Sequence, residues 1–211
     1  LIDSLYINHY IYNQTTNTGG LSFIYNKGKL NFNFGTNIGS SKYNQTNTFK
    51  NPQENLKRSF VNWNPNARLS YKFSQTKGLY FNYYGSTQQP SITQIQPVLD
   101  NTNPLNVAIG NPYLKPSFSN RFNLQYNSYK VLSQQGLFFW GTYGFTANPI
   151  VSNITTDQKT GASTYTYINT STATSNFNVD IDLNKKIKKL DINAGIDISA
   201  SGNKYLSYVN N

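Results

Sequence analysis

Two segments toward the end of the chain, residues 177–184 and 190–199, alternate an apolar residue with a polar or small one at every position. This period of two is the geometry of a β-strand, in which successive side chains point to opposite faces of a sheet. We therefore expect the chain to be all-β, with one apolar and one polar face. Less regular forms of the pattern recur at residues 21–25, 30–38, 69–73, 79–84, 122–126 and 137–145.

The connections between these segments alternate strictly between short and long. Short turns are expected at residues 26–29, 74–78, 128–136 and 184–189, and long connections at 39–57, 87–116 and 147–161. In an antiparallel meander this order places every long connection at one end of the sheet. Such asymmetry is typical of an outer-membrane barrel, whose strands need roughly 9–11 residues to cross the bilayer.

One further strand is expected at residues 5–12, the segment 177–184 is expected to belong to a strand within 165–184, and a loop is expected at 13–20. Pro65 predicts an edge, a bulge or a kink. The total is roughly nine strands, an odd number, whereas single-chain bacterial barrels have an even number. We therefore expect residues 1–211 to be part of a single, larger barrel domain that does not close alone.

The composition favours a β-barrel over an ordinary soluble domain. Only 12% of the 211 residues are charged and 15% are aromatic, whereas about a quarter of residues are charged in typical soluble domains. No apolar run approaches the length of a membrane-spanning helix, which leaves a soluble β protein or a barrel. The chain starts at Leu1 without methionine or a signal-peptide pattern, so we expect the gene to begin upstream.

The net charge of +10 permits binding to nucleic acid or to another anionic surface. However, the densest basic run, residues 185–189, lies where two alternating segments meet, which indicates a turn rather than a recognition stripe. The sequence has neither an RNA-binding aromatic signature nor a zinc-finger spacing, so no nucleic-acid partner is expected. The absence of cysteine excludes a disulfide framework and a cysteine-based metal site.

Four short motifs follow one another between residues 65 and 116. Each alone would indicate only a strand or a turn. They are Pro65-x3-Leu69-Ser70-Tyr71-x-Phe73, Leu79-x-Phe81-x-Tyr83-Tyr84, Gln89-Pro90-Ser91 and Gly110-Asn111-Pro112-x-Leu114-Lys115-Pro116. As a set they resemble the barrel of TonB-dependent outer-membrane receptors of the Bacteroidetes type, and the resemblance extends from about residue 21 onward.

This resemblance implies a transmembrane antiparallel β-barrel in the outer membrane of a Gram-negative cell, with its long loops outside. It also implies energy-coupled uptake of a nutrient, such as a metal chelate, a glycan or a peptide, through a plugged barrel. The partners that it implies are outer-membrane lipid, a TonB-type energy-coupling protein and, as a further candidate, a surface lipoprotein. A plug domain, a TonB-contacting segment and closing strands are not recognisable in this sequence.

The polar phase of the strands supplies candidate ligand-binding residues. If the apolar phase faces lipid, the polar phase lines a wet lumen. On it lie Arg121 and three aromatic residues suited to stacking on sugars or aromatic ligands, Tyr80, Tyr84 and Trp140. Tyr143 belongs to the apolar phase and is expected in the interfacial aromatic girdle. The motif at residues 110–116 is expected to be a rigid turn that returns the chain from loop to wall.

Catalytic and metal sites have little support in the sequence, and no cofactor is expected. Asp180, Asp182 and Asn184 imitate the start of an EF-hand loop, but Lys185 stands where glycine is needed, so a strand is favoured. The two aspartates also have the spacing of a glycosidase pair, but no apolar pocket that would raise a pKa is evident. His9 is the only histidine, and no nucleophile elbow accompanies it.

Two other functions stay open on the sequence alone. One is a receptor-like barrel that serves as a structural or docking component of a surface or secretion assembly. The other is a soluble carbohydrate-binding β-sandwich. A plug and a TonB box in the full gene would favour uptake, and stable protein partners without them would favour docking. A sandwich would bury its apolar face against a second sheet.

Overall fold

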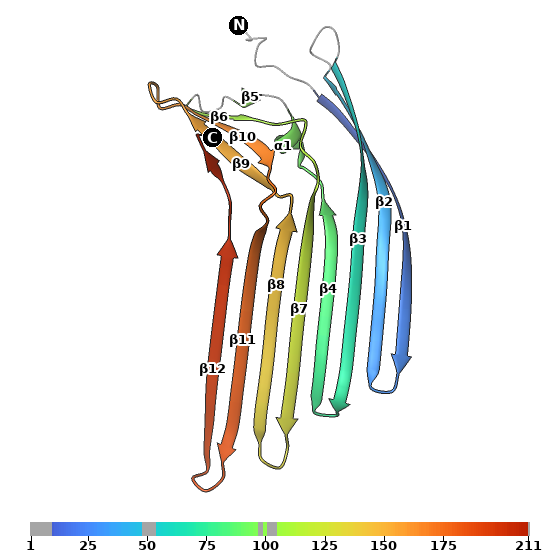
Figure 1. Ribbon diagram of the computed structural model, residues 1–211, viewed down its shortest axis with the longest axis vertical. Helices are drawn as coiled ribbons and strands as arrows, with labels where there is room; N and C mark the ends of the chain where they lie inside the picture. The colour runs from blue at the N-terminus through green and yellow to red at the C-terminus, as the bar shows by residue number, and fades with distance from the viewer. Residues whose placement is uncertain (1–9, 48–53, 97–98, 101–104, 211) are drawn as a thin grey trace.

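The computed structural model describes residues 10–47, 54–96, 99–100 and 105–210. Eight long strands form one tall, curved sheet, here called the wall (Figure 1). Every neighbouring pair is antiparallel, so the wall is the meander that the connection lengths predict. In sheet order, which is also chain order, the strands are β1 (Tyr10–Lys27), β2 (Leu30–Asn47), β3 (Glu54–Ser74), β4 (Lys77–Gln88), β7 (Ser117–Lys130), β8 (Gln135–Ala147), β11 (Thr174–Ile187) and β12 (Ile192–Lys204).

The short turns lie together at one end of the wall, and the segments between β4 and β7 and between β8 and β11 lie at the other (Figure 1). Gly28, Gln134 and Asp191 have positive φ angles of 56°, 46° and 49°, which reverse the chain within tight hairpins. An ion pair of 2.6 Å between Lys186 Nζ and an oxygen of Asp191 supports the last turn. The predicted asymmetry between the two ends is confirmed.

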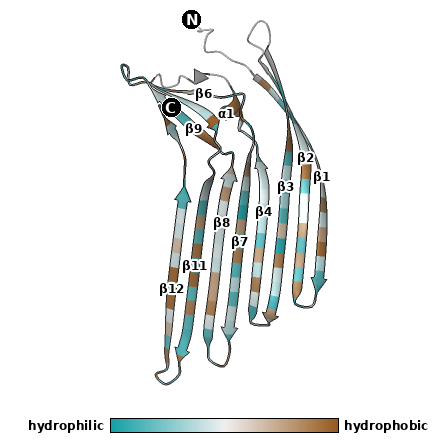
Figure 2. Ribbon diagram, in the orientation of Figure 1, coloured by the Kyte–Doolittle hydropathy of each residue, from teal (hydrophilic) through white to brown (hydrophobic). Residues whose placement is uncertain are grey.

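The register of the ladders aligns the apolar residues of all eight strands. Directly paired residues of antiparallel strands share a face. One such row consists of Phe23, Phe34, Ala67, Tyr83, Phe122, Tyr143, Phe177 and Gly202, and the next row toward the turns is equally free of charge. These rows form the apolar face of the wall, and the alternate residues form its polar face. Figure 2 shows the corresponding hydrophobic and hydrophilic bands along the strands.

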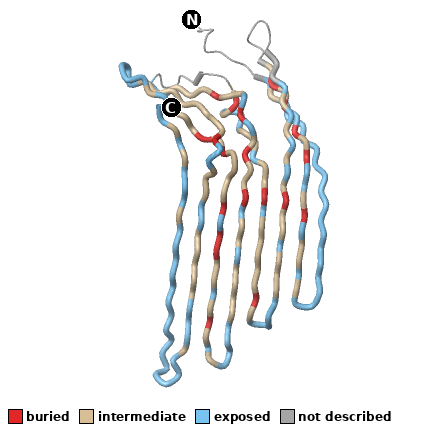
Figure 3. Tube along the Cα trace, in the orientation of Figure 1, coloured by how far each residue is buried: buried red, intermediate tan, exposed pale blue. Residues whose placement is uncertain are grey.

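The apolar face is left exposed. The exposed fraction is 58% for Phe23 and 60% for Ile196, and most of the wall is intermediate or exposed (Figure 3). Apolar side chains on such a surface need lipid rather than water as their neighbour. A soluble sandwich is therefore the wrong interpretation, because in the described residues no second sheet covers this face.

The apolar core of the molecule lies above the wall, at the loop end. Ile95, Leu114 and Val151 are buried there. Ser91 and Gln94 form a capping box at the start of the short helix, and no described helix is long and apolar enough to span a membrane. A second sheet occupies this region, in the order β13 (Tyr208–Val209), β9 (Ile150–Thr156), β10 (Ser163–Asn169), β6 (Asn106–Ile109) and β5 (Leu99–Asp100), beside α1 (Ile92–Ile95) (Figure 1).

We call this upper region, the described residues among 89–116, 148–173 and 205–210, the cap.

Several expectations about the loop end are wrong. Residues 13–20, expected as a loop, belong to β1, and much of the long connection expected at 39–57 belongs to β2 and β3. Because residues 10–12 and 21–25 lie in the single strand β1, the described wall has eight strands rather than about nine. In both regions the backbone ladder continues through mostly polar residues that were expected to be loop. The strand expected within 165–184 is divided between β10 of the second sheet and β11 of the wall.

Pro65 marks the point at which the ladder between β3 and β4 ends, since the paired residues begin at Asn66 and Tyr84. Proline has no N–H to donate to a neighbouring strand. Above it the Thr87 side chain replaces the ladder, because its Oγ1 accepts from the Trp63 N–H at 2.8 Å and donates to the Trp63 carbonyl at 3.1 Å. Of the three alternatives predicted at Pro65, the edge is therefore found on the β4 side only, since β3 and its ladder with β2 continue through this residue.

Replacing Leu124 by arginine in the intact barrel protein is expected to destabilise the folded state by about 2–4 kcal/mol, because this side chain lies on the apolar face near mid-height. The matched control, Asn123→Arg, puts the same side chain on the polar face and is expected to change stability by less than about 1 kcal/mol. Denaturant unfolding from lipid vesicles measures both changes. Equal losses would contradict the assignment of the two faces.

Candidate ligand-binding surface

The polar face of the wall carries all three arginines of the chain, Arg58, Arg68 and Arg121. Amide and hydroxyl side chains surround them. Such groups both donate and accept hydrogen bonds, so this face offers a polar surface that is cationic around the arginines. The row that contains Arg68 continues across the wall as Asn82, Asn123, Thr142 and Asn178.

The cap lies over this polar face. Gln89 donates from Nε2 to Oδ1 of Asn62, a polar-face residue of β3. Between the cap and the upper wall is a cavity of about 640 Å³, here called the cap hollow. Its wall side consists of polar-face residues and its upper side of cap residues. Its lining includes Ser119, Thr146 and Thr174 of the wall and Gln94, Val151 and Tyr205 of the cap.

Arg58 connects the wall to the cap. Its Nη2 donates to the carbonyl of Leu114, and its Cζ lies 4.7 Å from the centroid of the Phe60 ring. The Tyr43 ring packs 5.6 Å from Phe60 and 5.6 Å from Tyr12. Burial lowers the pKa of Arg58 and raises that of Tyr12, but a guanidinium stays protonated in proteins. The cluster is therefore a fixed cation held by aromatic rings and a cap carbonyl.

The motif at residues 110–116 forms the centre of the cap. The N–H of Gly110 donates to the Gln96 carbonyl at 3.1 Å, and that of Asn111 donates to the Gln94 carbonyl at 2.6 Å. These bonds hold the motif directly against α1. Only glycine allows so close an approach, because a Cβ at position 110 would lie 2.2 Å from the Gln96 carbonyl oxygen.

Two asparagines fix the end of this motif. Asn169 accepts the Lys115 N–H at 2.7 Å through Oδ1, and its Nδ2 donates to the Lys115 carbonyl at 2.9 Å and the Asn148 carbonyl at 3.1 Å. Asn148 in turn donates from Nδ2 to the Pro116 carbonyl at 3.0 Å. Leu114, within the motif, is 1% exposed. The motif therefore builds the turn from cap to wall, and none of its residues lines the cap hollow.

The four candidate residues all lie on the polar face, where they form two pairs. Tyr84 is directly opposite Arg121. Tyr80 and Trp140 lie on either side of Gln125 in another row. Four residues separate the two rows, which is about 13 Å along a strand. The pair of Tyr84 and Arg121 is nearer the cap, and the pair of Tyr80 and Trp140 is nearer the turns.

Tyr84 stands between two arginines on neighbouring strands. Arg68 donates from Nε to the Tyr84 hydroxyl at 3.1 Å, and its Cζ is 5.7 Å from the ring centroid. Arg121 flanks Tyr84 on the other side. In the described part of the chain neither arginine has a carboxylate within ion-pair distance. Both charges are therefore available to an anionic group of a ligand.

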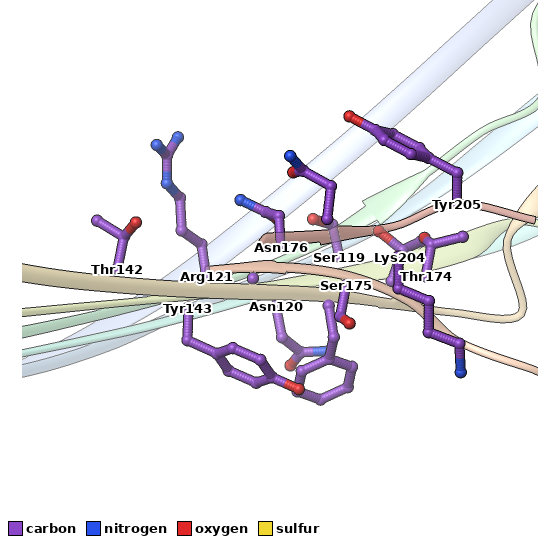
Figure 4. Close-up of a pocket in the computed structure, with 14 residues that line it drawn as sticks. Ser119, Asn120, Arg121, Thr142, Tyr143, Thr174, Ser175, Asn176, Lys204 and Tyr205 are labelled. Carbon is purple, nitrogen blue, oxygen red and sulfur yellow. The ribbon is translucent and has the colours of Figure 1, made fainter. Parts of the chain in front are cut away.

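Arg121 also borders a hollow of about 450 Å³ at the upper ends of β7, β8 and β11 (Figure 4). Figure 4 shows Arg121, Asn176 and Tyr205 on one side of the sheet and Tyr143 and Asn120 on the other. One ligand cannot contact both groups, because the sheet separates them. Tyr205 lines the cap hollow as well, so the polar side of this space continues into the cap hollow.

The sequence patterns did not identify the cap hollow. The polar alternation of the wall strands continues above the apolar band to Ser119, Thr146 and Thr174. This alternation was the one sequence feature that could have placed these residues on the lumenal face. Gln94 and Val151 reach the hollow only through the folding of the cap. No spacing in the sequence relates them to the wall residues.

The structure places the remaining candidates in ordinary strand positions. Asp180, Asp182 and Asn184 lie along β11, as the strand interpretation predicts, and Asp182 is paired with Asp197 on β12. Among the described residues no group of three or more His, Cys, Asp or Glu side chains is arranged to hold a metal ion. His9 lies outside the described residues.

A model of the outer membrane protein beta-barrel family matches residues 1–211. Among solved structures, the chain is similar to the siderophore receptor PirA from Pseudomonas aeruginosa, with a TM-score of 0.51, 12% sequence identity, and coverage of 93% of this chain and 44% of that one. For the siderophore receptor PirA from Acinetobacter baumannii the values are 0.48, 13%, 92% and 37%. The chain thus spans less than half the length of either receptor. No curated protein matches it.

Replacing Gly110 by alanine is expected to loosen the cap and leave the wall intact, because the new methyl group would meet the Gln96 backbone. Hydrogen–deuterium exchange of the intact barrel protein should become faster in α1 and β10 and stay unchanged in β4 and β7. Gly19→Ala is the matched control, since nothing lies within 4 Å of its added methyl group. Unchanged exchange in α1 of the Gly110 variant would contradict this role of the motif.

Proposed function

The chain belongs to the outer membrane protein beta-barrel family, and we propose that it forms part of the barrel wall of a TonB-dependent receptor that imports a nutrient. Membership of this family places the chain in the outer membrane of a Gram-negative cell, and the family is not one of enzymes. In a barrel of this type the apolar face meets lipid and the polar face lines the lumen. The loop end, with the cap, then faces the outside of the cell.

The cap over the lumenal face is the observation that carries the proposal. An open porin has a water-filled channel, whereas here loop segments with their own buried residues, Ile95, Leu114 and Val151, cover the upper lumen wall. The cap hollow between them gives a solute arriving from outside a place to bind before it passes along the wall. Capture before passage is the behaviour expected of a receptor.

The chemistry of the hollow supports a ligand rich in hydrogen-bonding groups. Its wall side presents the hydroxyls of Ser119, Thr146 and Thr174, and its cap side presents the amide of Gln94. Arg121 is two residues below Ser119 on the same face of β7. A metal chelate, a glycan or a peptide with one anionic group fits this combination of neutral donors, acceptors and one cation.

Energy coupling enters the proposal through segments beyond residues 1–211. A barrel closed by further strands, a plug domain and a segment that contacts a TonB-type protein would complete the receptor. A surface lipoprotein is a further partner that the proposal allows, above the cap. The fold similarity to a siderophore receptor supports a barrel of receptor size, and it does not identify the ligand.

Uptake of a labelled nutrient by cells that express the full gene is expected to fall to background when the TonB-type protein is deleted or the proton gradient is collapsed, because release through a plugged barrel requires energy. A panel of metal chelates, glycans and peptides identifies the nutrient. A barrel that takes up none of them and purifies with stable protein partners would instead be the docking component of a surface assembly.

Replacing Arg121 by glutamine is expected to weaken binding of an anionic nutrient by roughly 10- to 100-fold, because a charge-assisted hydrogen bond is lost. Trp140→Ala is the matched control on the same face; its effect should stay below about threefold, because Trp140 is about 13 Å deeper. Calorimetric titration of the purified barrel protein measures both. A larger loss at Trp140 would place the ligand near the turns rather than beneath the cap.

A further inference from the structure

The polar face carries asparagine at nearly one height on β2, β3, β4, β7 and β11. We call the row of Tyr84 and Arg121, together with the polar-face rows directly above and below it, the amide belt. Its asparagines include Asn33, Asn37, Asn66, Asn82, Asn123 and Asn176. Within the described strands the belt has no carboxylate, and Ile24 is its one aliphatic residue.

These six amides are not used to hold the fold together. In the described part of the chain none of them has a hydrogen-bond partner. By contrast, Asn64 of the same belt accepts the Thr87 N–H at 3.1 Å, and Asn169 of the cap is bonded through both its oxygen and its nitrogen. All six are exposed or half-buried. Serine and threonine would suffice for a wet lumen, so free amides at one height indicate groups kept for a ligand.

The belt connects two hollows of the polar face. The first, of about 550 Å³, lies across β1, β2 and β3, and its lining includes Asn33, Asn37, Asn66 and Arg68. The second is the polar side of the hollow beside Arg121 and Asn176 (Figure 4). Glycine leaves room for the amide there, because a Cβ at position 144 would lie 2.6 Å from Asn176 Oδ1. Five strand spacings, about 24 Å, separate β2 from β11. The belt is therefore a track for an elongated ligand that lies across the strands.

The belt suits hydroxyl groups better than it suits a peptide or an apolar chelate. An asparagine amide carries a donor and an acceptor side by side, so it can bind two neighbouring hydroxyls of a sugar ring. Tyr84, between the two hollows, is 38% exposed and offers a ring face on which a sugar can stack. A peptide would find no carboxylate for its amino group in the described belt. An apolar chelate would find only Ile24 for its hydrocarbon surface.

The charge of the belt selects among sugars. Arg68 and Arg121 are its charged residues in the described strands, and they stand on either side of Tyr84. Two strand spacings and one row separate their Cα atoms, which is about 12 Å. A guanidinium binds a carboxylate through two parallel hydrogen bonds. Carboxylates on different sugars of one chain can therefore reach both arginines.

We propose that the amide belt binds a short acidic oligosaccharide laid across the strands from β2 to β11. The amides bind its hydroxyls, Tyr84 stacks on one ring, and the two arginines hold its carboxylates. The upper row of the belt borders the cap hollow through Ser119, so a sugar captured beneath the cap reaches the amides next. The inference rests on the proposed function and names one class among the three kinds of nutrient that it allows.

The test is calorimetric binding of acidic tetrasaccharides to the purified intact barrel protein, with a panel built from glucuronate, galacturonate, mannuronate and guluronate. At least one member should bind. Asn82→Leu combined with Asn123→Leu is expected to weaken this binding by about 25-fold, or roughly fivefold for each amide removed. The matched control, Asn31→Leu with Asn127→Leu, changes two asparagines of the same face nearer the turns. It should stay within about threefold.

A serine pair separates recognition from polarity alone. Asn82→Ser with Asn123→Ser keeps the lumen polar, so it provides a second measurement where the leucine pair does not fold. The shorter side chains lose their reach to the sugar, and the affinity should still fall by about fivefold or more.

The role of charge is tested on both partners. Arg68→Gln with Arg121→Gln should weaken binding of the acidic tetrasaccharide by roughly 100-fold, or tenfold for each charge-assisted hydrogen bond. The methyl-esterified tetrasaccharide should bind the wild-type protein about as weakly, and the arginine variant should bind this ester within about threefold of the wild type. A tetraglutamate peptide, which has carboxylates but no sugar hydroxyls, should compete poorly.

Five results would overturn the inference. They are no binding by any member of the panel, full affinity in the asparagine variants, an equal loss in the control near the turns, equal binding of acid and ester, and strong competition by tetraglutamate. Energy-dependent uptake of a chelate or a peptide without binding of an acidic sugar would refute this inference and keep the proposed function. Binding of the sugar without energy-dependent uptake would do the reverse.

Discussion

The register of the wall ladders is the constraint on which the rest of the structure depends. Because side chains alternate between faces, a slip of one residue would exchange the two faces of a strand. In β7 such a slip would move Leu124 into the lumen and turn Arg121 and Asn123 toward lipid. An arginine at mid-depth costs about 2–4 kcal/mol, so the membrane itself selects the register. The arginines of the polar face and the paired aromatic residues of the apolar face follow from that choice.

The sequence predicts the wall best where its two faces meet different solvents. Residues 177–184 and 190–199 alternate without a break, and they form β11 and β12 as expected apart from the turn between them. Residues 13–20 and 40–47 belong to the same ladder, but polar residues and glycine occupy both of their faces except at Tyr43. Where both faces of a strand are polar, hydropathy does not alternate along the sequence. A run of Asn, Ser and Thr in such a strand therefore looks like a loop. The position of a strand end above the membrane therefore cannot be read from hydropathy.

The candidate site is predictable to a similar, partial extent. The alternation of apolar and polar residues in the sequence predicted that Tyr84 and Arg121 lie on the polar face. The ladder between β4 and β7 pairs them directly. The cap could not be predicted in the same way, because its contacts join residues such as Asn111 and Tyr167, whose hydrogen bond of 2.9 Å spans 56 positions. The four motifs between residues 65 and 116 together indicated an outer-membrane barrel, which the family match bears out, yet the role of residues 110–116 in holding α1 and β10 together is visible only in the folded cap.

Wall and cap are stabilised by different means, and this difference bears on function. The wall depends on continuous backbone ladders and on lipid against its apolar face, whereas the cap depends on a few buried side chains and on hydrogen bonds from asparagine. Arg58 and the turn at Pro116 are the connections between them that the structure shows most clearly. Segments with few buried contacts open locally at a small cost in free energy, while continuous ladders open only with the whole sheet. The receptor function proposed above needs that division, because the cap would have to admit and release a ligand while the wall stays closed to the membrane.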